Sequence, residues 1–145
     1  MKTSTSRLPE YARKDLQQIV SLVLENLPRC EMIILYGSYA RGTYVEYDER
    51  DEFGILTSFM SDYDILVVTS KSDVKEAGQI LDSVDQMYYK RPDHQVPIQF
   101  INDDIEKLNS DLSEGRYFYT DVKKEGIMLY DSGNYKLERA RKLDF

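Results

Sequence analysis

The sequence predicts one domain of the α/β or α+β class, built on a single small sheet with helices beside it. Two observations support this prediction: apolar residues recur at helical spacing in several segments, and these segments alternate with short runs rich in Ile, Leu and Val. The length of 145 residues is enough for one domain with a core of its own. No run of residues repeats, and no segment is of low complexity.

The N-terminal half of the chain predicts helices and strands on either side of a polar stretch. An apolar helical pattern ends at Pro28, and the first run of strand-forming residues is stopped by a glycine and a serine. The polar, aromatic stretch from Glu46 to Met60 is expected to be an inserted loop or hairpin. The other expected elements are a helix at Glu10–Leu27, a strand at Met32–Tyr36, a helix within Tyr39–Val45 and a strand at Asp64–Thr69.

The C-terminal half predicts further helices and strands in alternation. Ser72 has the chemistry of an N-cap for a helix that reaches about Tyr89. Pro97 predicts an edge strand or an early position in its strand, because proline cannot donate a ladder hydrogen bond. The remaining elements are a strand at Val96–Ile101, a helix at Asp103–Leu112 capped by Asn102 or Asp103, a helix at Tyr117–Lys124 and a strand at Ile127–Tyr130.

Composition restricts the class of protein. The net charge of −7, without a long basic stripe, disfavours non-specific binding to nucleic acid, which depends on lysine and arginine. No apolar run is long enough for a membrane span, and the N-terminus lacks the pattern of a secretory signal. The single cysteine, Cys30, excludes an internal disulfide. We therefore expect a cytoplasmic protein.

Two acidic residues at the start of a predicted strand are the strongest candidates for chemistry. Side chains two residues apart in a strand point to the same side, so Asp62 and Asp64 are expected to project together, with Tyr63 opposite. Adjacent carboxylates repel each other unless a cation or a proton lies between them. Mg²⁺, or Mn²⁺ in its place, is the expected cation, since it accepts carboxylate and phosphate oxygens in one shell.

A Gly-Ser turn after the first strand predicts a phosphate site. Gly37 allows close approach of the backbone to a phosphate, and Ser38 adds a hydroxyl and a backbone N–H. Arg41 lies near the end of this turn and can pair with phosphate oxygens.

These motifs resemble a known family. The segments Gly37-Ser38-Tyr39-Ala40-Arg41-Gly42 and Ser61-Asp62-Tyr63-Asp64-Ile65-Leu66-Val67-Val68 are similar to the signature of nucleotidyltransferases of the DNA polymerase β superfamily. Within it, the chain resembles small bacterial domains linked to or paired with HEPN domains, and residues 115–132 share this likeness. The resemblance implies an α+β fold with a mixed sheet flanked by helices. It also implies transfer of a nucleoside monophosphate from a nucleoside triphosphate such as ATP to an acceptor hydroxyl, with Asp62 and Asp64 binding metal and Gly37 and Ser38 holding phosphates.

The chain departs from the family pattern at two places. About a dozen extra residues, roughly 44–59, separate the two motifs, and they form either a solvated loop or an element that recognises the acceptor. The family also implies a third carboxylate on a neighbouring strand, whereas Val96–Ile101 offers only Gln99. Asp93 and Asp103 flank that strand and would reach the site only in another register.

Three functional hypotheses follow from the sequence. The first is a metal-dependent nucleotidyltransferase, and the second is a non-catalytic domain that binds a nucleotide or a partner. The third is the antitoxin side of a HEPN pair. Residues 1–133 are expected to form the nucleotidyltransferase domain, and the basic tail at 134–145 is expected to be solvated and to lead to a HEPN-like helical domain.

Overall fold

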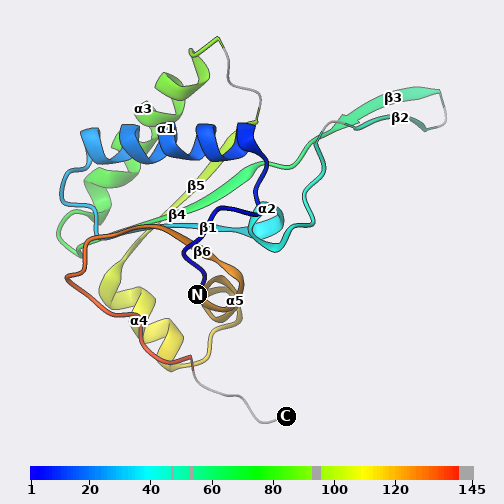
Figure 1. Ribbon diagram of the computed structural model, residues 1–145. Helices are drawn as coiled ribbons and strands as arrows, with labels where there is room; N and C mark the ends of the chain where they lie inside the picture. The colour runs from blue at the N-terminus through cyan, green and yellow to red at the C-terminus, as the bar shows by residue number, and fades with distance from the viewer. Residues whose placement is uncertain (47, 53, 93–95, 141–145) are drawn as a thin grey trace.

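A four-stranded mixed sheet forms the centre of the computed structural model, which describes residues 1–46, 48–52, 54–92 and 96–140 (Figure 1). The strand order is β5-β4-β1-β6. The central pair, β1 (Met32–Tyr36) and β4 (Tyr63–Thr69), is antiparallel, as is the pair of β1 and β6 (Ile127–Asp131). β4 runs parallel to β5 (Ile98–Asp104) at the edge. The predicted α+β class, with a small mixed sheet and flanking helices, is confirmed.

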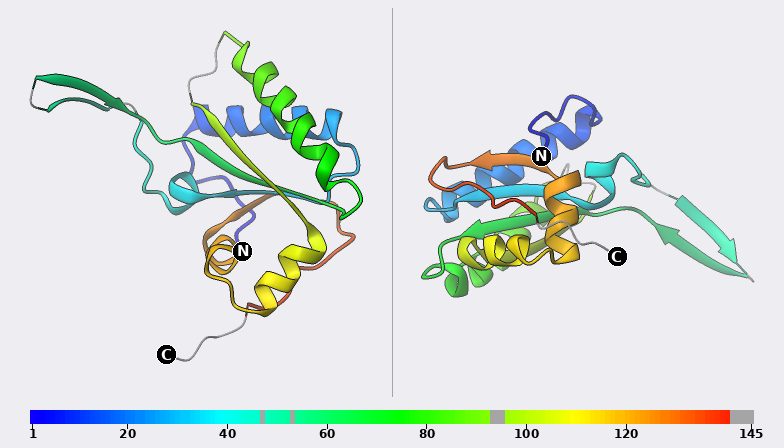
Figure 2. Two further views of the ribbon diagram at one scale, coloured as in Figure 1. Left: turned by 180° about the vertical axis from the view of Figure 1, so that it is seen from behind. Right: turned by 90° about the horizontal axis from the view of Figure 1, so that it is seen from below.

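Helices cover both faces of this sheet (Figures 1 and 2). α1 (Glu10–Asn26) and α3 (Val74–Tyr89) pack on one face, where residues such as Ile33, Leu35 and Ile65 of the strands join their core. α4 (Ile105–Ser113) and α5 (Tyr117–Glu125) lie on the other face, over the alternate residues of the same strands. β1 and β4 are therefore apolar on both sides, which explains their continuous runs of Ile, Leu and Val. None of the described helices is long and apolar enough to cross a membrane.

The polar stretch between the two motifs forms a hairpin. β2 (Asp48–Glu52) and β3 (Ile55–Phe59) pair antiparallel and project away from the body of the domain (Figure 2). Two hydrogen bonds close the base of the hairpin: the Val45 N–H donates to the Ser61 hydroxyl at 2.8 Å, and the Ser61 N–H donates to the Val45 carbonyl at 2.9 Å. The sequence predicted either a loop or a hairpin for this stretch, and the structure has the hairpin.

Two helix starts differ from prediction. α2 spans Gly37–Arg41 and ends at Gly42, whose left-handed backbone closes the helix, so it lies earlier than the predicted Tyr39–Val45. α3 follows Asp73 rather than Ser72, and the Ser72 hydroxyl instead lies 3.1 Å from that of Ser70. Neither start carries a side-chain cap, so the capping chemistry of Ser72 was a poor guide to the start of α3.

The boundary between β5 and α4 also lies later than predicted. β5 continues to Asp104, because its pairing with β4 persists as far as Thr69. Asp104 then caps α4, its carboxylate accepting a hydrogen bond of 2.8 Å from the Lys107 N–H, so neither Asn102 nor Asp103 is the cap.

The described part of the C-terminal tail, residues 134–140, lies against α4 and α5. The Asn109 side chain donates to the Lys136 carbonyl at 3.1 Å and accepts from the Glu138 N–H at 2.8 Å. Leu137 and Ala140 pack against the core on that face. This segment is thus attached to the domain instead of fully solvated, and its role as a linker stays a prediction.

Candidate active site

The antiparallel pairing of β1 and β4 brings the two sequence motifs together. Tyr36, the last residue of β1, is the register partner of Asp64, the second residue of β4. The chain turns into α2 immediately after Tyr36, so Gly37 lies against Asp64 although the hairpin separates them in sequence.

The structure gives a specific reason for a glycine at position 37. Its φ of +76° is in the left-handed region, and a Cβ atom there would lie 2.2 Å from Asp64 Oδ2 and 3.1 Å from Asp64 Cγ. The Gly-Ser motif alone predicted that this glycine makes room for a phosphate. The structure shows that the space beside it holds the carboxylate of the second motif.

The alternation at the start of β4 places the acidic residues as predicted. Tyr63 is fully buried on the face covered by α1, and its hydroxyl donates a hydrogen bond of 2.7 Å to Asp15 Oδ2. Asp62 and Asp64, on either side of it, are half-buried. Burial raises the pKa of Asp64, and the nearby Asp62 carboxylate raises it further, while Arg41 opposes the rise. The Asp64 carboxylate therefore lies close enough to Asp62 for the charge of Asp62 to act on it.

A groove of about 460 Å³ collects the predicted residues from four segments of the chain. Ser38 and Arg41 come from α2, Asp62 immediately precedes β4, Asp64 lies in β4, and Gln99 lies in β5. Gly37 does not line the groove itself but lies behind Asp64. Residues at the base of the hairpin complete the wall: Thr43, Val45, Met60 and Ser61. No sequence motif predicted these four residues as part of the site.

Arg41 is shared between the groove and α5. Its Nη1 atom lies 3.5 Å from Oε2 of Glu125, and the two side chains are 46% and 37% exposed. At this exposure the ion pair is weak, so Arg41 can exchange Glu125 for another anion. Nothing in the sequence near Glu125 marked it as a neighbour of the Gly-Ser turn, because Arg41 and Glu125 are 84 positions apart in the chain.

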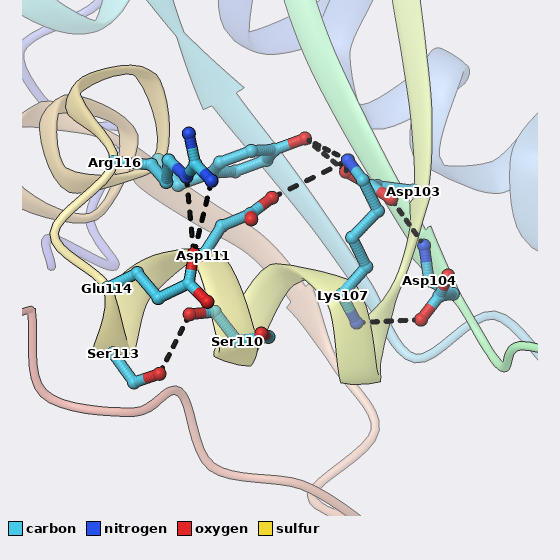
Figure 3. A network of polar contacts seen from close by, with 9 residues as sticks. Asp103, Asp104, Lys107, Ser110, Asp111, Ser113, Glu114 and Arg116 are labelled. Carbon is cyan, nitrogen blue, oxygen red and sulfur yellow. Dashed lines mark hydrogen bonds and ion pairs between the residues drawn. The ribbon is translucent and has the colours of Figure 1, made fainter.

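The parallel pairing of β4 with β5 shows which residue of β5 lies beside Asp64. Asp64 is the register partner of Gln99, which is exposed and lines the groove. Asp103 lies four residues further along β5, about 13 Å away at strand spacing. It is 7% exposed, with hydrogen bonds from Tyr119 and from Lys107 at 3.1 Å (Figure 3). Asp103 is therefore not part of the groove, and Asp93 lies outside the described residues.

The carboxylates of Asp62 and Asp64 suit a hard divalent cation that a phosphate also binds. In the described part of the chain, no group of three or more His, Cys, Asp or Glu residues could hold a metal by itself. Mg²⁺ commonly binds through one or two carboxylates and completes its shell with substrate phosphates and water. Asp62 and Asp64 can supply these carboxylates, and a cation beside them would relieve their mutual repulsion.

Comparison with solved structures finds similarity across most of the chain, whereas no protein-family model and no curated protein matches it. A protein of Sulfolobus solfataricus provisionally assigned as a nucleotidyltransferase is 20% identical, with a TM-score of 0.49 over 86% of this chain and 87% of that one. A chain of a toxin–antitoxin structure with AMP-PNP is 19% identical, with a TM-score of 0.40 over 81% of this chain and 74% of that one. A chain of the complex of the tri-AMPylated Shewanella oneidensis HEPN toxin with MNT antitoxin is 14% identical, with a TM-score of 0.38 over 83% of this chain and 72% of that one.

The structural matches thus include nucleotidyltransferase and HEPN toxin–antitoxin structures, the group that the sequence motifs resemble.

Proposed function

We propose that the chain binds a nucleoside triphosphate with a divalent cation and transfers its nucleoside monophosphate to an acceptor hydroxyl. The observation that carries the proposal is the groove in which Ser38, Arg41, Asp62 and Asp64 meet. Asp62 and Asp64 would hold Mg²⁺ or Mn²⁺, while the Ser38 hydroxyl and the Arg41 guanidinium would bind phosphate oxygens. The cation, when bound, supplies positive charge that offsets the charge of the phosphates.

The reaction forms one bond and breaks one bond at the α-phosphorus. The acceptor oxygen attacks and forms a new O–P bond, the bond from the α-phosphorus to the oxygen bridging it to the β-phosphorus breaks, and pyrophosphate leaves. The acceptor hydroxyl loses its proton in this step. The cationic Arg41 would stabilise charge on the phosphates, and it is already placed beside the Asp64 carboxylate that the phosphates would approach.

Position 99 has no carboxylate that could accept the proton of the acceptor hydroxyl. Gln99 faces the groove, but a neutral amide is a poor metal ligand and cannot serve as a base. Proton loss to solvent is slower, and a missing general base typically costs about 10²–10⁴-fold in rate. We therefore propose that the domain by itself turns over slowly.

Calorimetry with ATP tests the binding step. ATP should bind with Mg²⁺ and lose this binding in EDTA, and Asp64→Asn should lose the metal-dependent part. Asp82→Asn is the matched control, because it removes the same charge from an exposed position on α3. Equal affinity in EDTA, or an unchanged affinity in Asp64→Asn, would remove the cation and the carboxylate pair from the proposal.

A second candidate function is non-catalytic binding of a nucleotide or a partner, and Gln99 is the observation that favours it. The sequence resemblance suggests a HEPN-domain protein as the partner, with this chain as the antitoxin. Pyrophosphate release distinguishes the two functions: tight metal-dependent ATP binding without turnover, in the presence of a co-purifying HEPN protein, would support the second. Turnover by the domain alone would contradict it.

A further inference from the structure

A second hollow borders α2, next to the groove of the carboxylate pair. Its volume is about 160 Å³, and it is formed where the N-terminal segment crosses the end of α2 and the start of β6. Arg41 lines both this hollow and the groove. Its other lining residues include Lys2, Arg7, Leu8, Tyr39, Gly42 and Tyr44.

The charge of this hollow is opposite to that of the chain. Three basic residues line it, Lys2, Arg7 and Arg41, and no Asp or Glu is among the described residues of its wall. The whole chain carries a net charge of −7, so a wall with only positive charges is a local exception. Such a concave basic surface raises the local concentration of anions.

Two of these cations are not used by the fold. Neither Lys2 nor Arg7 forms an ion pair with any residue that the structure describes. Among the described residues, Arg41 pairs with Glu125 at 3.5 Å and also interacts with the charge of Asp64. The charge of Glu46 acts on Tyr39 of the wall. An incoming anion would therefore have at least two cations without competing partners.

The backbone that carries the cations is held in place. The Lys2 N–H donates to the Gly126 carbonyl at 3.3 Å, and the Met128 N–H donates to the Lys2 carbonyl at 2.8 Å, so residue 2 is joined to the edge of β6. Leu8, one residue after Arg7, is buried in the core, and its N–H donates to the Thr5 carbonyl at 3.0 Å. A site with an anchored backbone loses less conformational entropy on binding than a flexible tail would.

We infer that this hollow is a second anion site, which takes a phosphate group without a metal ion. Its volume is below the roughly 300–1,000 Å³ of pockets for drug-sized ligands, so it suits a phosphate or pyrophosphate rather than a whole nucleotide. Arginine and lysine are the usual partners of phosphate oxygens. Free phosphate, pyrophosphate and the terminal phosphate of a larger molecule share this chemistry, and the site goes beyond the proposed transfer reaction.

Calorimetry in EDTA tests this site separately from the carboxylate groove. The probes are inorganic phosphate, pyrophosphate and 5′-AMP, and any purification tag is placed at the C-terminus so that the N-terminal segment is unchanged. The parent should bind phosphate or pyrophosphate, and Lys2→Gln combined with Arg7→Gln should weaken binding at least tenfold. Lys71→Gln combined with Lys75→Gln is the matched control, because it removes two exposed positive charges elsewhere and should change little. Tighter binding of 5′-AMP than of phosphate would identify a terminal phosphate as the natural source.

A second measurement keeps the inference testable if the double variant is less stable. Titration of phosphate into the labelled parent should shift the amide resonances of residues near the hollow, such as Leu8 and Gly42, and Asp64→Asn should show the same shifts. Absence of binding at millimolar phosphate, equal loss in the control variant, or equal affinity for sulfate would overturn a phosphate site. Loss of ATP binding in Asp64→Asn with phosphate binding retained would separate this inference from the proposed function.

Discussion

A side-chain carbon on Gly37 would lie 2.2 Å from Oδ2 of Asp64, so the glycine of the first motif is required by the carboxylate of the second. The contact exists because Tyr36 and Asp64 are register partners and the chain turns into α2 one residue later. The position of Asp64 in the groove therefore depends on a residue that does not line the groove.

Gly37→Ala should displace Asp64 and abolish metal-dependent ATP binding. The left-handed backbone costs roughly 1–2 kcal/mol for a residue with a Cβ, and relief of the overlap with the carboxylate adds about 1–3 kcal/mol. Gly42→Ala is the control, since Gly42 has a similar φ of +80° but nothing within 4 Å of an added Cβ. Urea unfolding and calorimetry should show a smaller loss of stability and retained ATP binding for Gly42→Ala. Equal behaviour of the two variants would mean that backbone strain alone matters.

Asp64→Asn should be at least as stable as the parent at pH 7 in EDTA. Burial and Asp62 raise the pKa of Asp64, so the folded state holds this proton to a higher pH than the unfolded chain does. The ionised carboxylate then destabilises the fold at neutral pH, and this penalty falls to zero as the pH drops through the folded and then the unfolded pKa. Thermal melts at pH 7 and below pH 4 should show a difference that disappears on acidification. A marked drop in Tm at pH 7 would instead make Asp64 a structural residue.

Glu125→Gln should strengthen ATP binding by releasing Arg41. The pair is half-exposed and worth about 1 kcal/mol at most, so the gain should be no more than about fivefold and the Tm should barely change. Arg41→Gln should weaken ATP binding, because it removes the guanidinium from the groove. Glu114→Gln is a suitable control, since it breaks another exposed arginine pair, that with Arg116. If Glu125→Gln weakened binding, Glu125 would be holding Arg41 in its productive position.

Gln99→Asp should raise the rate of pyrophosphate release in the presence of a suitable acceptor, by up to about 10²–10⁴-fold. The register of β4 and β5 puts the new carboxylate beside Asp64, where it can bind the cation and accept the proton. Gln79→Asp, on the exposed side of α3, adds the same charge away from the groove and should have no effect. Rapid turnover by the parent chain would show that another group already removes the proton, and Asp93 would be the first residue to test.

Much of the fold follows from local patterns in the sequence. The buried strands β1 and β4 are short Ile-, Leu- and Val-rich runs, and the amphipathic helices α1 and α3 repeat their apolar residues at helical spacing, so both kinds of element could be located within a few residues. The errors lie at element ends. Pairing with β4 extends β5 to Asp104, which no local window shows. Gly42 ends α2 at Arg41, and a glycine at this place is a local stop signal that the predicted helix at 39–45 ran past.

The sequence by itself determined the chemistry of the site: which residues carry the carboxylates and the Gly-Ser turn, and that period-two spacing directs Asp62 and Asp64 away from the buried Tyr63. Only the tertiary structure decided what these residues meet. Strand register placed Gly37 against Asp64 and Gln99 beside it, packing of α5 brought Glu125 to Arg41, and the path of the N-terminal segment gathered Lys2 and Arg7 near the same helix. The physical reason is that side-chain periodicity is local, whereas register and helix packing depend on burying the whole core at once.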